Sequence, residues 1–267
     1  MAQSVSEQLD AGNLDGAIDT LNQEVRQFPT DTARRSLLAE LLCFAGNFER
    51  ADRLLDAVQH QDTSVAMGVA LFRQLIRAEE ARLSFYSQCR LPEFLAPPTE
   101  HDQLYLQALV ALKDGERERA AQLLADAEGQ RTPLGGKVDG TAFDDMRDLD
   151  DVSATHLDVL TSTGKFFWVP LRTVESIKLH RPEHRRETLW RRATLSVAGG
   201  PDGEIFLPTI YPSASGPGSA AARLGLETDF VGGDREPTRG VGLRSFIFGE
   251  DARSILEIGA VEFNPAP

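Results

Sequence analysis

Apolar residues recur at helical spacing through the first half of the chain. Residues three, four and seven positions apart share one helix face, so this pattern predicts amphipathic helices. Residues 66–89 keep the pattern long enough to predict a single long helix. Residues 2–131 are therefore predicted to be mainly helical, with three or four helix pairs. The two clearest apolar stripes are Ala17, Ile18, Leu21, Val25 and Phe28, and Leu37, Leu38, Leu41, Leu42 and Ala45.

The helical half contains an internal repeat. The stretch AGNLDGAIDTL begins at Ala11, and AGNFERADRLL begins 34 residues later at Ala45. A third copy, DGERERAAQLL, begins at Asp114. A period of 34 residues is typical of the tetratricopeptide repeat, a helix–turn–helix unit. The glycine of each copy can end the first helix in the left-handed conformation. A small residue, at Ala17, Ala51 and Ala120, would let the second helix pack closely on the first.

The pattern changes after residue 131, where glycine and proline become frequent and short apolar runs stand between turn signals. The sequences STG before Lys165 and GGPDG before Glu204 predict hairpin turns. We predict an α+β protein, with tetratricopeptide-like helical repeats over residues 1–131 and a β-rich, mainly antiparallel domain over residues 132–267. The expected strands are His156–Thr161, Lys165–Val169, Ser176–Leu179, Ala193–Val197, Glu204–Leu207, Gly242–Phe248 and Ile255–Phe263.

Charge and composition narrow the classes of partner. The formal charge is −13, from 28 basic and 41 acidic side chains, and both halves are acidic. Nucleic-acid binding needs a cationic surface, so this class of partner is excluded. The N-terminal MAQSVSEQLD lacks the features of a signal peptide, and no stretch approaches the ~20 apolar residues of a membrane span. We expect a cytoplasmic protein with no membrane partner, and with Cys43 and Cys89 as buried thiols.

Five aspartates lie within the eight residues DDMRDLDD, which raises the question of a metal or acid–base site. A calcium-binding EF-hand loop needs glycine at position six and glutamate at position twelve, where this stretch has Leu149 and Thr155. The open alternatives are ion pairing or turn capping, contact with a partner, and metal-dependent catalysis. Arginine pairs carboxylates bidentately, and HRPEHRRETLWRR is the one basic cluster. We therefore expect a structural polar cluster of Asp144, Asp145, Asp148, Asp150, Asp151, Arg181, Arg185 and Arg186.

Two other motifs match functional patterns only formally. His180 and His184 have the spacing of a helical metal pair, but Pro182 between them disfavours that helix. The stretch GPGSAA at 216–221 fits G-x-G-x-x-A, but Pro217 removes a backbone donor and no βαβ pattern surrounds it. We expect loops at both places.

The sequence contains no P-loop, zinc-protease motif or nucleophile elbow. Trp168 and Trp190 stand in apolar contexts and are expected in the core. We predict no catalytic residue, no bound metal and no cofactor.

Six stretches after residue 131 carry a family resemblance: GKVDGTAFDDMRDLDD, TGKFFWVPL, TLWRRATL, DGEIFLPTIYP, RLGLETDF and GVGLRSFIFGE. In this order they resemble the ImpE/SciE-type (TagJ-like) family, accessory proteins of bacterial type VI secretion. The resemblance spans nearly the whole chain and implies a non-enzymatic adaptor. It implies binding to the small subunit of the contractile sheath, with an effect on sheath stability or on disassembly by an AAA+ ATPase.

Tetratricopeptide arrays present a concave groove that takes a helix or an extended peptide. Sliding the repeat template along the chain places Ala33, Ser36 and Glu40 in this groove, together with Asp102 and Tyr105. We expect these five residues to contact the partner. Two alternatives stay open, a general assembly chaperone with many clients and a metal-dependent enzyme that uses the Asp144–Asp151 cluster.

Overall fold

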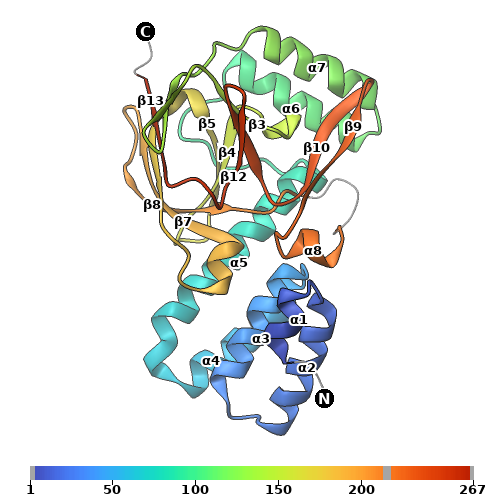
Figure 1. The fold of residues 1–267 in the computed structure, drawn as a ribbon, viewed down its shortest axis with the longest axis vertical. Helices are drawn as coiled ribbons and strands as arrows, with labels where there is room; N and C mark the ends of the chain where they lie inside the picture. The colour runs from blue at the N-terminus through green and yellow to red at the C-terminus, as the bar shows by residue number, and fades with distance from the viewer. Residues whose placement is uncertain (1–3, 213–217, 265–267) are drawn as a thin grey trace.

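The computed structural model describes residues 4–212 and 218–264. A helical part precedes a β-rich part, and the long helix α5 runs from one into the other (Figure 1). The predicted long helix over 66–89 is confirmed and ends one residue early, at Gln88. None of the helices in these two ranges has the length and apolarity needed to cross a bilayer. The helices are α1 (Val5–Asp10), α2 (Leu14–Gln27), α3 (Thr32–Phe44), α4 (Phe48–Gln61), α5 (Ala66–Gln88), α6 (Glu100–Lys113), α7 (Arg117–Gly129) and the short α8 (Ala220–Arg223).

The repeated glycine and asparagine build the turns between paired helices. Gly12 and Gly46 each have a φ of 73°, and Gly115 has a φ of 80°, which is the left-handed region that the sequence predicted. The side chains of Asn13 and Asn47 then accept the N–H three residues further on and cap α2 and α4. Glycine ends one helix and asparagine starts the next. The alanines predicted at the close helix contacts, Ala17, Ala51 and Ala120, are fully buried.

The β-rich part is antiparallel throughout its named strands, as predicted. Its main sheet has eight strands in the order β2-β1-β13-β6-β7-β8-β4-β5, beside a three-stranded sheet, β12-β11-β3, and the ribbon β10-β9. The strands are β1 (Gly136–Val138), β2 (Thr141–Phe143), β3 (Met146–Asp148), β4 (His156–Leu160), β5 (Phe166–Pro170), β6 (Val174–Leu179), β7 (Trp190–Val197), β8 (Gly203–Pro208), β9 (Thr228–Gly233), β10 (Glu236–Gly242), β11 (Ser245–Phe248), β12 (Asp251–Ser254) and β13 (Ala260–Phe263).

Both predicted hairpins are confirmed, because β4 pairs with β5 and β7 pairs with β8 in antiparallel register. The predicted strand Ile255–Phe263 is wrong in its first five residues. The carboxylate of Glu257 accepts the N–H and hydroxyl of Ser254 and forms a turn there. The predicted strand Gly242–Phe248 is divided at Gly242, whose φ of 84° ends β10 before β11 begins.

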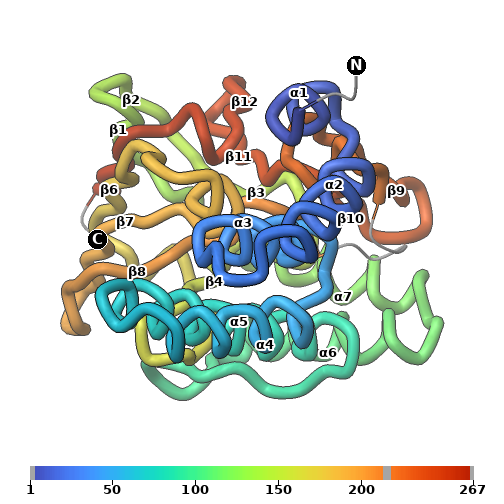
Figure 2. The backbone as a smooth tube through the Cα atoms, turned by 90° about the horizontal axis from the view of Figure 1, so that it is seen from below, coloured from blue at the N-terminus to red at the C-terminus, as the bar shows by residue number. Residues whose placement is uncertain are grey.

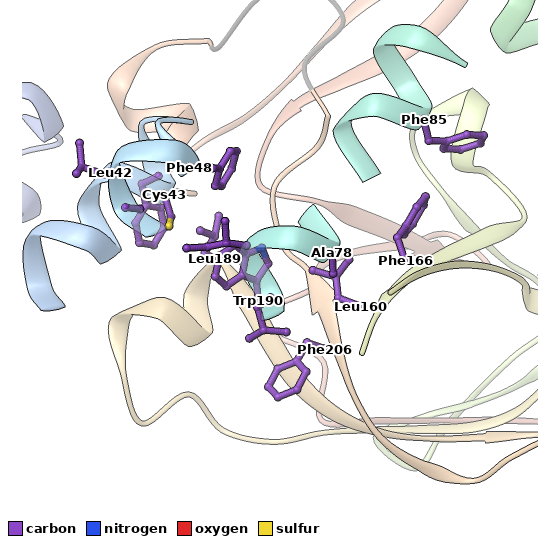
Figure 3. Packing of buried hydrophobic residues seen from close by; sticks show 14 of the residues in the cluster. Leu42, Cys43, Phe48, Ala78, Phe85, Leu160, Phe166, Leu189, Trp190 and Phe206 are labelled. Carbon is purple, nitrogen blue, oxygen red and sulfur yellow. The ribbon is translucent and has the colours of Figure 1, made fainter. Parts of the chain in front are cut away.

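Strand β4 lies between two apolar cores and is buried along its whole length. Leu157 and Val159 face the core enclosed by the main sheet and the three-stranded sheet. Leu160 belongs instead to the core shared with the helices, where Figure 3 shows it beside Ala78 of α5. The link between α7 and β1 contains the predicted division at residue 131. One apolar core joins the helices and the sheet, and the division into two domains at residue 131 stays a prediction.

We expect alanine to have opposite effects at two glycines. Gly46→Ala forces an alanine into the left-handed region and should lower the free energy of unfolding by about 1 kcal/mol. Gly68→Ala should raise it by about 0.5–1 kcal/mol, because Gly68 lies inside α5 and an added Cβ meets no atom within 4 Å. Urea denaturation measures both values. Equal effects at the two positions would contradict the proposed role of the repeat turn.

Candidate functional site

The carboxylate of Asp158 on β4 is the centre of a buried polar network between the sheet and α5. Arg82 donates to Oδ2 at 2.8 Å, and Arg244 donates to the same oxygen at 2.6 Å. Tyr86 donates its hydroxyl to Oδ1 at 2.8 Å. Burial alone would raise the pKa of Asp158. The two guanidinium groups lower this pKa below its usual value, and Arg244 has the larger effect. Asp158 is therefore held ionised in the interior.

Arg82 extends the network from α5 to two further segments. Its Nη1 donates to Glu79 at 2.7 Å, and its Nη2 donates to the backbone carbonyl of Ile210 at 2.9 Å. Glu79 also accepts the indole N–H of Trp190, at the start of β7, at 3.2 Å. The Arg82 guanidinium thus fixes α5 against β4 and against the segment after β8, and its partner Glu79 fixes α5 against β7.

Asp148 completes the network and leaves it with an excess of acidic groups. Its Oδ1 accepts the hydroxyl of Tyr211 at 2.7 Å, and its Oδ2 lies 3.3 Å from Nε of Arg244 without hydrogen-bond alignment. The network then holds three buried carboxyl groups and two guanidinium groups. Burial raises the pKa of Asp148 to about 7 despite Arg244. A proton on Asp148 leaves the buried charges balanced.

A second polar cluster docks the start of α6 on the sheet. Arg172 donates to both carboxylate oxygens of Asp102 at 2.7 Å, and Nε2 of His156 lies 3.0 Å from Oδ1. The His156 ring stacks on Trp168 with centroids 3.6 Å apart. Burial would raise the pKa of Asp102, but the hydrogen bonds from His156 and Arg172 lower it well below its usual range. Burial also lowers the pKa of His156.

Two of the five residues that we expected in the partner groove lie in this buried cluster instead. Asp102 and Tyr105 are almost completely buried, and the ring of Tyr105 packs edge-on against His156 and Trp168. The sheet of the same chain therefore occupies the face of α6 that the repeat template assigned to a partner. Ala33 is exposed on α3, while Ser36 and Glu40 are partly buried there. Partner contact at these three residues stays a prediction.

The aspartates of residues 144–151 pair with other arginines than those expected. Each of the following arginine–aspartate contacts has an N–O distance of 3.3 Å or less: Arg131–Asp145, Arg147–Asp151, Arg239–Asp150 and Arg244–Asp148. No ion pair among the described residues joins this stretch to Arg181, Arg185 or Arg186. Arg186 instead pairs with Glu40 at 3.2 Å, because the segment before β7 turns toward α3. Asp144 is exposed.

Two of these aspartates accept backbone N–H groups of β10 that a neighbouring strand would otherwise accept. The N–H of Thr238 donates to Asp151 at 2.7 Å, and the N–H of Gly240 donates to Asp150 at 3.0 Å. Arg239, between them, pairs with Asp150 through its side chain. The acidic stretch thereby seats the β9–β10 ribbon on the rest of the fold. The carboxylates are used in structural contacts, and no metal-binding group of three His, Cys, Asp or Glu occurs within 4–212 and 218–264.

The segment before β7 enters the helical part and borders a cleft. Leu189 and Trp190 join the core that contains Leu42, Cys43 and Phe48 (Figure 3). A cleft of about 270 Å³ lies between this segment and α5. Its apolar lining consists of Leu71, Phe72, Leu75, Trp190 and Phe206, and its rim carries Gly68, Glu183, His184, Arg186, Glu187, Arg192 and Glu204.

The remaining candidate motifs have plain structural roles or lie outside the described residues. Residues 180–184 form no helix, so the metal-pair spacing of His180 and His184 is not realised. Gly216 and Pro217 of the GPGSAA stretch lie outside the described residues, and Ser219 caps the short α8 that follows. Trp168 and Trp190 are both buried, as predicted. Of the two free cysteines, Cys43 is buried and Cys89 only partly.

Sequence reasoning missed Glu79, Arg82, His156, Asp158 and Arg244, which form the centres of both networks. The available signal was the placement of charged residues on the buried stripe of α5 and in the otherwise apolar HLDVL. Charged groups are rarely fully buried unless they are paired. Each such residue therefore predicts a partner elsewhere in the chain.

Fold and site together define a tetratricopeptide-repeat protein whose repeats are fixed to a β-rich partner within the same chain. Residues 8–71 match a tetratricopeptide-repeat model, and residues 140–262 match the model of the ImpE protein family. The β-rich part of the chain is therefore of the ImpE type, and the part before it is of the tetratricopeptide type.

Two full-length relatives support this assignment. The chain is 28% identical over 265 residues to the type VI secretion system accessory component TagJ of Pseudomonas aeruginosa, covering 99% of this chain and 92% of that protein. The crystal structure of protein VPA1032 from Vibrio parahaemolyticus matches with a TM-score of 0.91 at 26% identity, over 98% of each chain. The likeness therefore includes both the helical and the β-rich parts.

Asp148→Asn should change how stability depends on pH. A carboxyl group whose pKa is raised on folding keeps its proton in the folded state after the unfolded chain has lost it. Its contribution is present at low pH and is lost as the pH rises from about 4 to about 7. The variant should therefore gain stability relative to the wild type over this range, by up to about 1.4 kcal/mol per pH unit.

Urea denaturation of both proteins at several pH values between 4.5 and 8 measures this difference. If the amide also has a cost in stability that does not depend on pH, it shifts the variant's curve of unfolding free energy against pH. It does not change how the difference between the two proteins varies with pH. Parallel curves would contradict a protonated Asp148 in the folded protein.

Proposed function

We propose that this protein is a non-enzymatic adaptor of a type VI secretion system that acts in the cytoplasm. Its partner is the small subunit of the contractile sheath. This protein binds a short helical segment of that subunit. The observation that supports this most strongly is the similarity to a type VI secretion accessory component over 99% of the chain. Similarity of this extent covers the repeats, the sheet and the contacts between them.

The cleft beside α5 is the proposed binding site for the helix. An amphipathic helix binds a groove through apolar residues on one of its faces. The cleft has an apolar floor and a rim of both charge signs, so it suits a helix with one apolar face and flanking polar residues. Met67, one residue before Gly68 on α5, is an apolar side chain with 88% of its surface exposed. The predicted contact residues Ala33, Ser36 and Glu40 lie on α3, and Glu40 meets Arg186 of the rim.

The same binding would connect the protein to sheath turnover. A helix held in the cleft is withdrawn from other proteins that recognise it, or is brought to them in a fixed position. We propose an indirect link of this kind to the AAA+ ATPase that disassembles the sheath. The direction of the effect follows from whether the ATPase and this protein contact the same segment of the sheath subunit.

Two other functions receive less support. A metal-dependent enzyme would need free carboxylates, and four of the five aspartates in the acidic stretch are paired with arginines. A general chaperone would need an open groove for many clients, and the chain's own sheet and the segment before β7 occupy part of the helical surface. Pull-down from cell extract separates these ideas, since an adaptor recovers one dominant sheath subunit and a chaperone recovers many proteins.

Filling the cleft at Gly68 should prevent sheath-subunit binding. Gly68→Gln places a long side chain at the rim without disturbing the packing of α5, because no atom lies within 4 Å of the added Cβ. We expect the affinity for the small sheath subunit of the same organism to fall at least tenfold, which is about 1.4 kcal/mol or more. Isothermal titration calorimetry with the purified subunit measures it.

Gly68→Ala is the matched control, since both substitutions raise helix propensity at the same position but alanine is too short to fill the cleft. A second control is Val110→Gln on α6, an exposed apolar residue outside the cleft. Both should bind like the wild type. Unchanged binding by Gly68→Gln would place the helix elsewhere, and no binding by the wild type would refute the sheath-subunit partner.

A further inference from the structure

Strand β9 forms an open edge of the fold. Within the described residues it pairs only with β10, and all six of its residues are exposed. Both overall views show it at the periphery of the molecule (Figures 1 and 2). The ribbon is nevertheless firmly placed, because Asp150 and Asp151 hold the inner edge of β10. An outer edge on a fixed ribbon can receive a further strand.

The register shows which backbone groups of β9 face outward. Phe230 is paired with Gly240, whose N–H points away from β9 toward Asp150. In antiparallel pairs the two opposite residues either both bond to each other or both point away. The N–H of Phe230 therefore faces outward, where the side chain of Asp229 accepts it at 2.8 Å. A neighbouring residue thus satisfies a backbone group that a strand would otherwise engage.

Apolar side chains and a cavity accompany this edge. Leu226, Phe230 and Val231 are 58%, 38% and 36% exposed, which places three large apolar side chains within six residues. Val231 also lines a cavity of about 510 Å³ between the ribbon and the helices, together with Leu83 and Leu112. Backbone hydrogen bonds give affinity in strand addition, and pockets for alternate side chains give specificity. The edge of β9 offers both.

The charges at this edge determine the kind of segment that fits. Glu227 and Asp234 flank the strand and Asp229 lies within it, and none of the three takes part in an ion pair among the described residues. A second copy of the chain would bring the same carboxylates together, and each chain already carries a formal charge of −13. A segment with basic side chains would instead neutralise them. The charge pattern favours a basic partner over self-association.

We propose that the outer edge of β9 is a strand-addition site for an extended partner segment in which apolar and basic residues alternate. This site is separate from the cleft beside α5 and takes a different secondary structure. The protein can then hold a helix at one site and an extended chain at the other. The inference goes beyond the proposed function, since it adds a second partner.

The proposal is tested with a fluorescent octapeptide of alternating valine and lysine and a matched peptide of alternating valine and glutamate. Fluorescence anisotropy should detect binding of the valine–lysine peptide and at least tenfold weaker binding of the other. Phe230→Pro removes the outward N–H while the bonds of β9 to β10 stay, so it should weaken binding at least tenfold. Amide hydrogen exchange should slow at residue 230 of the wild type when the peptide is present.

Asp229→Lys provides a variant that keeps the backbone donor and reverses the charge. It should weaken binding of the valine–lysine peptide and strengthen that of the valine–glutamate peptide. Equal binding of both peptides, or no effect of Phe230→Pro, would overturn the proposal. So would a dimer in sedimentation velocity that Phe230→Pro dissociates, since the occupant would then be a second copy. Gly68→Gln should leave peptide binding unchanged, which keeps this test independent of the sheath-subunit test.

Discussion

The negative charge of Asp158 lies on a strand that is buried on both faces, so it must be neutralised within the chain. Arg82 from α5 and Arg244 from the segment between β10 and β11 supply the compensation. Removing one partner of a buried ion pair typically costs about 3–5 kcal/mol, because the remaining charge is left without compensation. The helix and the sheet therefore cannot separate at this point without exposing these charges to water or stranding them. This interaction fixes the repeats to the β-rich part and thereby forms the cleft beside α5.

The acidic stretch, which joins this network through Asp148, has a comparable role for the β9–β10 ribbon. Carboxylates normally seen in metal or acid–base sites here accept backbone N–H groups of β10 and pair with Arg131 after α7, Arg147 of β3 and Arg239 of the ribbon itself. Side-chain oxygens can replace a neighbouring strand because a carboxylate accepts several hydrogen bonds in different directions. The stretch is thus a structural support, and within the described part of the chain the opposite edge of the ribbon pairs with no further strand. The same arrangement that stabilises β10 exposes β9.

The repeats and most strands could be predicted from the sequence because local rules determine them. The spacing of apolar residues sets the helices, and glycine followed by asparagine sets the turns at Gly12 and Gly46. The polar networks could not be predicted in this way. Asp158 and Arg82 are 76 residues apart, and their contact depends on how α5 crosses the sheet. We expected the aspartates to pair with the one basic cluster of the sequence, which contains Arg181, Arg185 and Arg186. Their observed partners come from other segments, which the fold brings close to the acidic stretch.

The position of the network along α5 has a mechanical consequence. Arg82 lies in the last third of a 23-residue helix, and the first two repeats, formed by α1 to α4, are attached to the other end. At ~1.5 Å per residue, the arm from Arg82 to Ala66 is about 24 Å long, so a tilt of roughly 5° at the pivot moves the far end by about 2 Å. Small adjustments of the pivot are therefore amplified at the repeats. Helix α5 thus carries the first two repeats at a distance from the charged side chains that fix it to the sheet.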